Sequence, residues 1–69
     1  MLEIGDKFII SDLFKRIEKL YPTHKLLDIE TKDKGYKMEI KTFYKNKPMH
    51  KIEVLKDGVL FEVTKLTIL

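Results

Sequence analysis

No cysteine occurs in this chain of 69 residues, although a chain so short lies near the lower limit for folding without a covalent or metal staple. A disulfide framework and a cysteine-based zinc site are therefore both excluded. Hydrophobic residues make up 43% of the sequence and are spread along it, which favours a folded core over disorder. We expect one small domain spanning residues 1–69, with self-association as a further way to bury surface.

One segment near the N-terminus has the spacing of an amphipathic helix. A helix over Asp12–Tyr21 places five apolar side chains on one face, namely Leu13, Phe14, Ile17, Leu20 and Tyr21. Pro22 ends this helix, and Ser11 or Asp12 is the expected N-cap.

Segments of alternating polarity, separated by turn residues, follow the helix. Strands are expected over Lys25–Lys32, Tyr36–Lys45, Met49–Lys56 and Val59–Thr64, the last open to extension, with a short candidate strand over Lys7–Ile10 before the helix. The turns are Asp33-Lys34-Gly35, Asn46-Lys47-Pro48 and Asp57-Gly58, the last being the strongest hairpin signal. The fold class is α+β: a single helix packed on one face of a four- to five-stranded antiparallel sheet, in the order (β)-α-β-β-β-β.

Alternation along these strands assigns side chains to the two faces of the sheet. The helix-facing set is Leu27, Ile29, Tyr36, Met38, Ile40, Ile52, Val54, Val59, Phe61 and Val63. The opposite face, which no remaining element covers, carries charged residues together with Leu26, Phe43, Leu55 and Leu60. An Asp57-Gly58 turn sets Leu55 opposite Leu60 and Glu53 opposite Glu62.

Apolar residues on the uncovered face suggest a protein contact, because a face left in water should be polar. Phe43, Leu55 and Leu60 are the candidate partner-binding residues. These residues would form either the interface of a homodimer with stacked sheets or a binding surface for another protein. The alternative is that a terminal segment folds over them.

Lysines suggest a second kind of partner. Thirteen of the fourteen basic residues are lysine, and residues 32–51 carry a local charge of +5. The candidate nucleic-acid-binding residues are Lys37, Lys41, Lys45, Lys47 and Lys51, with Phe43 or Tyr44 available for base stacking. Binding would be largely independent of sequence, because lysine lacks the bidentate fork that reads guanine. The alternative is a solvated face whose lysines discourage aggregation.

Catalytic constellations are sparse. Glu39-Ile40-Lys41 with Asp28 has the Glu-x-Lys spacing of one class of metal-dependent nucleases, but that spacing arises readily by chance in a chain that is 36% charged. Ser11 suits a helix cap better than a nucleophile, and His24 and His50 lie 26 positions apart without companion ligands. We expect no enzyme, no catalytic or metal-binding residues and no cofactor.

The sequence has no apolar run long enough to span a bilayer and no signal peptide at residues 1–6, so the expected location is the cytoplasm and no membrane partner is expected. Alanine, glutamine, tryptophan and cysteine are absent, a bias typical of AT-rich genomes and their phages. The leading hypothesis is a small non-catalytic protein-binding module, of the kind that a phage or mobile element uses as an inhibitor or adaptor that occludes a host protein. The alternative hypothesis is a sequence-independent nucleic-acid-binding protein.

Overall fold

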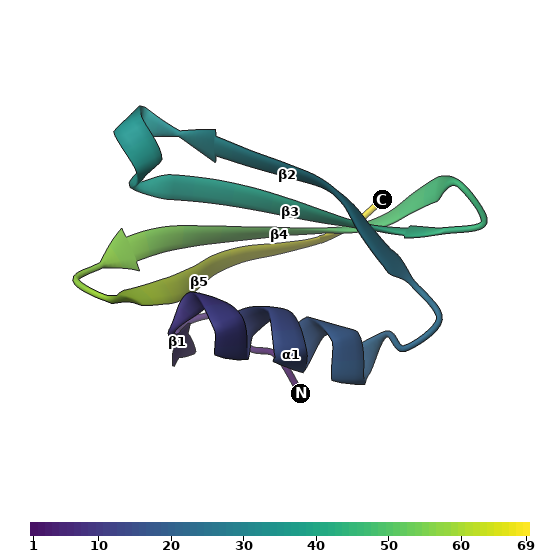
Figure 1. Cartoon of the computed structure of the whole chain (residues 1–69), viewed down its shortest axis with the longest axis horizontal. Helices are drawn as coiled ribbons and strands as arrows, with labels where there is room; N and C mark the ends of the chain where they lie inside the picture. The colour runs from purple at the N-terminus through teal and green to yellow at the C-terminus, as the bar shows by residue number, and fades with distance from the viewer.

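In a computed structural model, the chain forms one α-helix and a single antiparallel sheet (Figure 1). The elements are β1 (Lys7–Phe8), α1 (Ile10–Leu20), β2 (Lys25–Lys32), a short 3-10 turn (Asp33–Gly35), β3 (Lys37–Tyr44), β4 (Lys47–Asp57) and β5 (Leu60–Ile68). The structure describes the backbone of residues 1–69 and the side chains of all residues except 26 and 27.

The sheet has the strand order β1-β5-β4-β3-β2, so every sequence neighbour from β2 to β5 is joined by a hairpin. The two-residue strand β1 adds to the outer edge of β5. The helix lies beside β1 and β5 on one face, and β2 lies at the far side of the sheet (Figure 1). The predicted α+β class with a single helix is confirmed, and the candidate N-terminal strand completes a five-stranded sheet.

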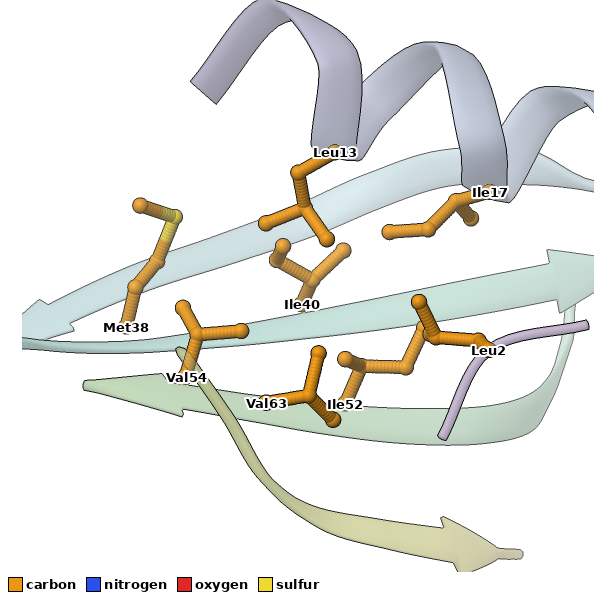
Figure 2. Packing of buried hydrophobic residues seen from close by; sticks show 8 residues of the cluster. All are labelled: Leu2, Leu13, Ile17, Met38, Ile40, Ile52, Val54 and Val63. Atoms are coloured by element: carbon orange, nitrogen blue, oxygen red, sulfur yellow. The ribbon is translucent and has the colours of Figure 1, made fainter. Parts of the chain in front are cut away.

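Side chains from the helix and the three central strands form the core (Figure 2). Leu13 and Ile17 are the two helix residues that are fully buried, as the spacing of the apolar residues predicts. They pack with Leu2, Met38, Ile40, Ile52, Val54 and Val63. The buried Leu2 shows that the N-terminal segment adds to the helix side of the sheet.

The helix begins earlier than the sequence predicts. Ile9 takes the N-cap position without a side-chain hydrogen bond, so neither Ser11 nor Asp12 caps the helix. The helix follows directly after β1, and this allows Ile10 to pack against the core. Asp12 instead lies in the first turn, where a carboxylate interacts favourably with the positive end of the helix dipole.

The β4–β5 hairpin turns one position later than predicted. Asp57 pairs with Leu60, which leaves Gly58 and Val59 as the turn and places Leu55 opposite Glu62 rather than Leu60. A bulge at Thr64 then sets Glu53 opposite Lys65 rather than Glu62. Between the turn and the bulge the pairing differs from the prediction by two residues, so Leu55, Leu60 and Glu62 stay on their predicted face.

Three residues assigned to the helix-facing set are exposed. Ile29 pairs with Ile40 but is 45% exposed, because the helix does not extend over β2. Tyr36 precedes β3 and Val59 lies in the turn. The assignments made for Leu26 and Leu27 lie outside the described side chains.

Candidate nucleic-acid interface

The uncovered face of the sheet is electrically balanced. Apart from Lys25, which pairs with Phe43 at the end that carries the β3–β4 turn, cross-strand pairing places six basic and six acidic residues on it. The basic residues are Lys7, Lys32, Lys37, Lys41, Lys51 and Lys65, and the acidic residues are Asp28, Glu30, Glu39, Glu53, Asp57 and Glu62. Three of the five lysines that the sequence offered for nucleic-acid binding are therefore placed among carboxylates, which cancel their long-range field.

Two ion pairs occupy the residues of the Glu-x-Lys pattern. The Lys41 ammonium lies 3.6 Å from the Asp28 carboxylate, and the Lys32 ammonium donates a hydrogen bond of 3.0 Å to Glu39. This hydrogen bond is the main cause that lowers the pKa of Glu39 and raises the pKa of Lys32. Among the residues with described side chains, no three His, Cys, Asp or Glu residues are grouped to hold a metal ion.

The three apolar candidates for protein binding do not form one strip. Leu55 and Leu60 lie near each other beside the β4–β5 turn, and Leu55 is 47% exposed. Phe43 lies towards the other end of the sheet, where it pairs with Lys25 and Pro48.

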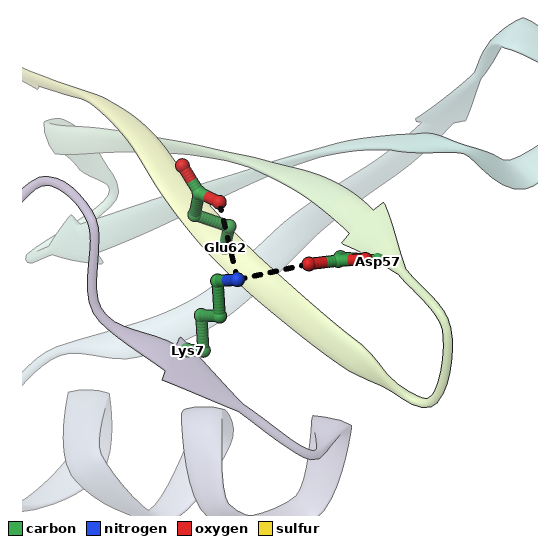
Figure 3. Close-up of polar contacts among 3 residues, drawn as sticks. All are labelled: Lys7, Asp57 and Glu62. Carbon is green, nitrogen blue, oxygen red and sulfur yellow. Dashed lines mark hydrogen bonds and ion pairs between the residues drawn. The ribbon is translucent and has the colours of Figure 1, made fainter.

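Ion pairs lie beside the β4–β5 turn (Figure 3), and they involve Glu62 and Asp57, which pair with Leu55 and Leu60. Lys7 donates a 2.9 Å hydrogen bond to Asp57 and lies 3.9 Å from a Glu62 oxygen. The bond to Asp57 is the main cause that raises the pKa of Lys7. The surface around Leu55 and Leu60 is therefore a small apolar patch within a charged surround.

Positive charge is concentrated at the end of the molecule that carries the β3–β4 turn. Residues 21–25 and 43–50, here called the basic tip, contain three lysines and no acidic residue. The rest of the chain has eleven basic and eleven acidic residues, so the whole net charge of +3 belongs to the tip. Lys25, Lys45 and Lys47 are all exposed there.

Contacts between aromatic and histidine rings join the two segments of the tip. The His50 ring stacks on Tyr21 at 4.2 Å between centroids, and His24 lies 5.2 Å from Tyr21 and 5.4 Å from Tyr44. The Thr42 hydroxyl and His50 Nδ1 are 2.9 Å apart, within hydrogen-bond distance. These contacts hold the loop after the helix against the β3–β4 hairpin, and so bring Lys25 to the same end as Lys45 and Lys47.

The turn of this hairpin is Lys45-Asn46, one position before the predicted Asn46-Lys47-Pro48. Both turn residues have positive φ, 50° and 65°, and Tyr44 pairs with Lys47. Positive φ at both turn residues is the geometry that two-residue hairpins favour, and it places the exposed Lys45 and Lys47 at the end of the sheet.

The backbone conformation of Lys45 destabilises the fold, because a left-handed backbone is unfavourable for a residue with a Cβ atom. We expect Lys45→Gly to raise the free energy of unfolding by about 1 kcal/mol, measured by urea denaturation. Lys47→Gly, at a strand position, is the matched control and should lower the free energy of unfolding. A lower stability for Lys45→Gly would contradict the left-handed turn.

His50 makes the tip sensitive to acid. Burial, and secondly the charge of His24, lower the pKa of His50 below its ordinary value of 6.5. Because His50 is protonated more readily in the unfolded chain than in the folded chain, its neutral form contributes fully to the free energy of unfolding above about pH 6.5. This contribution is lost as the pH falls from about 6.5 towards the lower pKa of His50 in the folded chain.

We therefore expect the urea concentration at the unfolding midpoint to decrease as the pH is lowered from about 7.5 to about 5.5. This range lies above the ordinary pKa of 4.5 for Glu39, so the titration of that carboxylate contributes little to the decrease. His50→Gln, whose amide can still reach Thr42, should remove much of this fall. An equal fall in both proteins would assign the effect to other groups.

A shallow depression lies on the tip. Thr23, Lys25, Phe43, Lys45 and Asn46 line it, and its volume is about 70 Å³. Its lining combines a half-buried ring with two ammonium groups and two polar side chains. Beside it, the Lys45 ammonium lies 5.4 Å from the centre of the Tyr44 ring, which is 39% exposed. The depression thus offers an apolar surface and positive charge within a few ångströms of each other.

Sequence reasoning identified Lys45, Lys47, Phe43 and Tyr44 but missed the role of the histidines. Their separation of 26 positions gave no local motif, and only the fold shows that Tyr21 lies between their segments. The available signal was the absence of acidic residues from 21–25 and 43–50, which is visible in the sequence.

Comparisons with protein-family models, with curated proteins and with solved structures gave no match for this chain. In the described part of the chain, no helix combines the length and apolar character needed to cross a membrane.

Proposed function

We propose that this protein is a non-catalytic binding domain that uses the basic tip to bind single-stranded nucleic acid without sequence preference. The observation that carries the proposal is the segregation of charge. Three exposed lysines surround aromatic rings at one end, with no acidic residue among them, while the rest of the chain is neutral. Neutralising phosphates with lysines releases counterions and drives association.

The rings favour a single strand over a duplex. Bases of a single strand are free to stack on aromatic side chains, and every base has a face that can do so. Phe43 lines the depression together with Lys25 and Lys45, and the Lys45 ammonium lies near the Tyr44 ring. A base stacked on either ring would therefore have its phosphate close to a lysine. Lysine provides a point charge without a bidentate fork, so the binding would not depend on base identity.

The experiment is fluorescence anisotropy with labelled strands of about ten nucleotides, at low salt. We expect homopolymeric and mixed-sequence single strands to bind with similar Kd values, and a duplex of equal length to bind more weakly. Tighter binding of the duplex would exclude base stacking at the tip, and no binding of any strand would exclude the proposal.

Leu55 and Leu60 favour protein binding as the second candidate function, because two adjacent leucines of an uncovered sheet face are the kind of surface that another protein buries. In that case the protein is an inhibitor or adaptor that acts by covering a site on its partner. Leu55→Asp with Leu60→Asp should then abolish the complex and leave nucleic-acid binding intact. Charge reversal in the basic tip should have the opposite pair of effects.

A further inference from the structure

The outer edge of β5 is open beyond the point where β1 ends. β1 pairs only with Phe61 and Glu62, and the preceding loop bonds with Val63 through Gly5 and Asp6. In the described backbone, no strand pairs with the outer edge of residues 65–68. An open edge of this kind is a ready template for another strand.

Hydrogen bonding shows which backbone groups on this edge are free. The Leu69 N–H donates to the Met49 carbonyl at 3.0 Å, and Thr67 pairs with Lys51 in the same ladder. Residues 67 and 69 therefore direct their N–H and C=O groups towards β4. Because these groups alternate along an antiparallel strand, Leu66 and Ile68 direct theirs outwards.

The side chains of these two residues are apolar and accessible. Ile68 is 85% exposed and Leu66 is 39% exposed, and both lie on the helix side of the sheet, as their partners His50 and Ile52 do. They border an apolar cavity of about 250 Å³ that Leu2 and Ile52 also line. The edge thus combines unpaired backbone groups with exposed apolar side chains.

We propose that this edge pairs with the same edge of a second copy of the chain, in an antiparallel register with its two-fold axis at Thr67. Leu66 then lies opposite the partner's Ile68 and exchanges both backbone hydrogen bonds with it, and the reciprocal pair does the same. Thr67 lies opposite the partner's Thr67, and Lys65 lies opposite the partner's Leu69. No two like charges meet.

In this register residues 65–69 of the two copies overlap. The partner's β5 runs in the opposite direction, so its earlier residues extend beyond the end of β5 and away from β1, which lies at the other end of the strand. The two sheets would form one continuous sheet with ten strands.

The other open edge, on β2, suits self-pairing less well. The registers that pair seven or eight residues of Lys25–Lys32 with the same strand of a second copy set Asp28 opposite Asp28, Lys25 opposite Lys32, or Asp28 opposite Glu30. Like charges directly opposite destabilise a strand pair. The β5 register opposes no like charges, and this favours a second copy at β5 over these long registers of β2.

Sedimentation equilibrium of the full chain tests the proposal. The wild type should approach twice its mass of 8.2 kDa as its concentration rises to about 1 mM. Ile68→Pro removes an outward N–H and no bond to β4, so it should weaken the dimer at least tenfold with an unchanged circular dichroism spectrum. A monomer at the highest concentration, or a dimer that Ile68→Pro leaves intact, would overturn the proposal.

A charge swap tests the register. Thr67→Lys and Thr67→Glu should each be monomeric alone, because each sets like charges opposite each other across the two-fold axis. An equimolar mixture should dimerise again. If the mixture stays monomeric, or if either variant dimerises alone, this register is wrong.

Discussion

Reversing the charge of the three lysines in the basic tip should abolish nucleic-acid binding. In Lys25→Glu with Lys45→Glu and Lys47→Glu, three attractions to phosphate, each worth about 1 kcal/mol in water, become repulsions. Loss of the attractions alone corresponds to more than 100-fold in Kd. The measurement is anisotropy with a labelled single strand at low salt.

The matched control reverses the same number of charges on the uncovered face. Lys37→Glu with Lys41→Glu and Lys51→Glu gives the same net charge but changes a surface where acids already balance the lysines. We expect this variant to lose much less affinity, chiefly through the change in overall charge. Equal losses in the two variants would mean that total charge, and not the basic tip, determines binding.

Two isoleucines that face each other across β2 and β3 should differ widely in their contribution to stability. Ile40 is fully buried beneath the helix, whereas its pairing partner Ile29 is 45% exposed at the edge of the sheet. We expect Ile40→Ala to lower the free energy of unfolding by about 3 kcal/mol, through lost burial and a new cavity. A domain of this size has only about 3–10 kcal/mol in total.

Ile29→Ala is the matched control, because it removes the same atoms from the neighbouring strand. Without a closed cavity, its cost should be about 1 kcal/mol. Urea denaturation of the two variants gives both values. Equal costs would show that another element covers β2.

Those two residues also show how far the fold could be predicted from sequence. Alternating polarity placed Ile29 and Ile40 on the same face, and their pairing confirms it. Alternation has no information on how far one short helix extends across a sheet, so the exposure of Ile29 did not follow. The bounds of β2 were predicted correctly, because the turn residues on both sides of Lys25–Lys32 mark its ends.

Turn positions were less predictable. The turn residues Asn46-Lys47-Pro48 and Asp57-Gly58 correctly predicted that a hairpin forms in each place. They did not predict which residues pair across it, because each turn lies one position away from the predicted one. Bulges at Met49 and Thr64 then shift the register along each hairpin, while Ile52, Val54 and Val63 remain in the core.

The candidate site was predicted only in part. Local composition identified the lysines around the β3–β4 turn, but counting charge along the chain could not separate Lys45 and Lys47 from Lys37 and Lys41. That separation depends on cross-strand neighbours such as Asp28, which come from other parts of the sequence. The ring cluster depends in the same way on contacts between residues distant in sequence.

The most direct test of the central claim is the salt dependence of binding to a single strand. If three lysines contact three phosphates, log Kobs should fall against log salt concentration with a slope of about −2, or about twentyfold between 50 and 200 mM. Lys45→Gln with Lys47→Gln should reduce the slope to about −0.7, that of a single contact. A slope near zero in the wild type, or one that this double substitution leaves unchanged, would contradict the basic tip as the phosphate-binding surface.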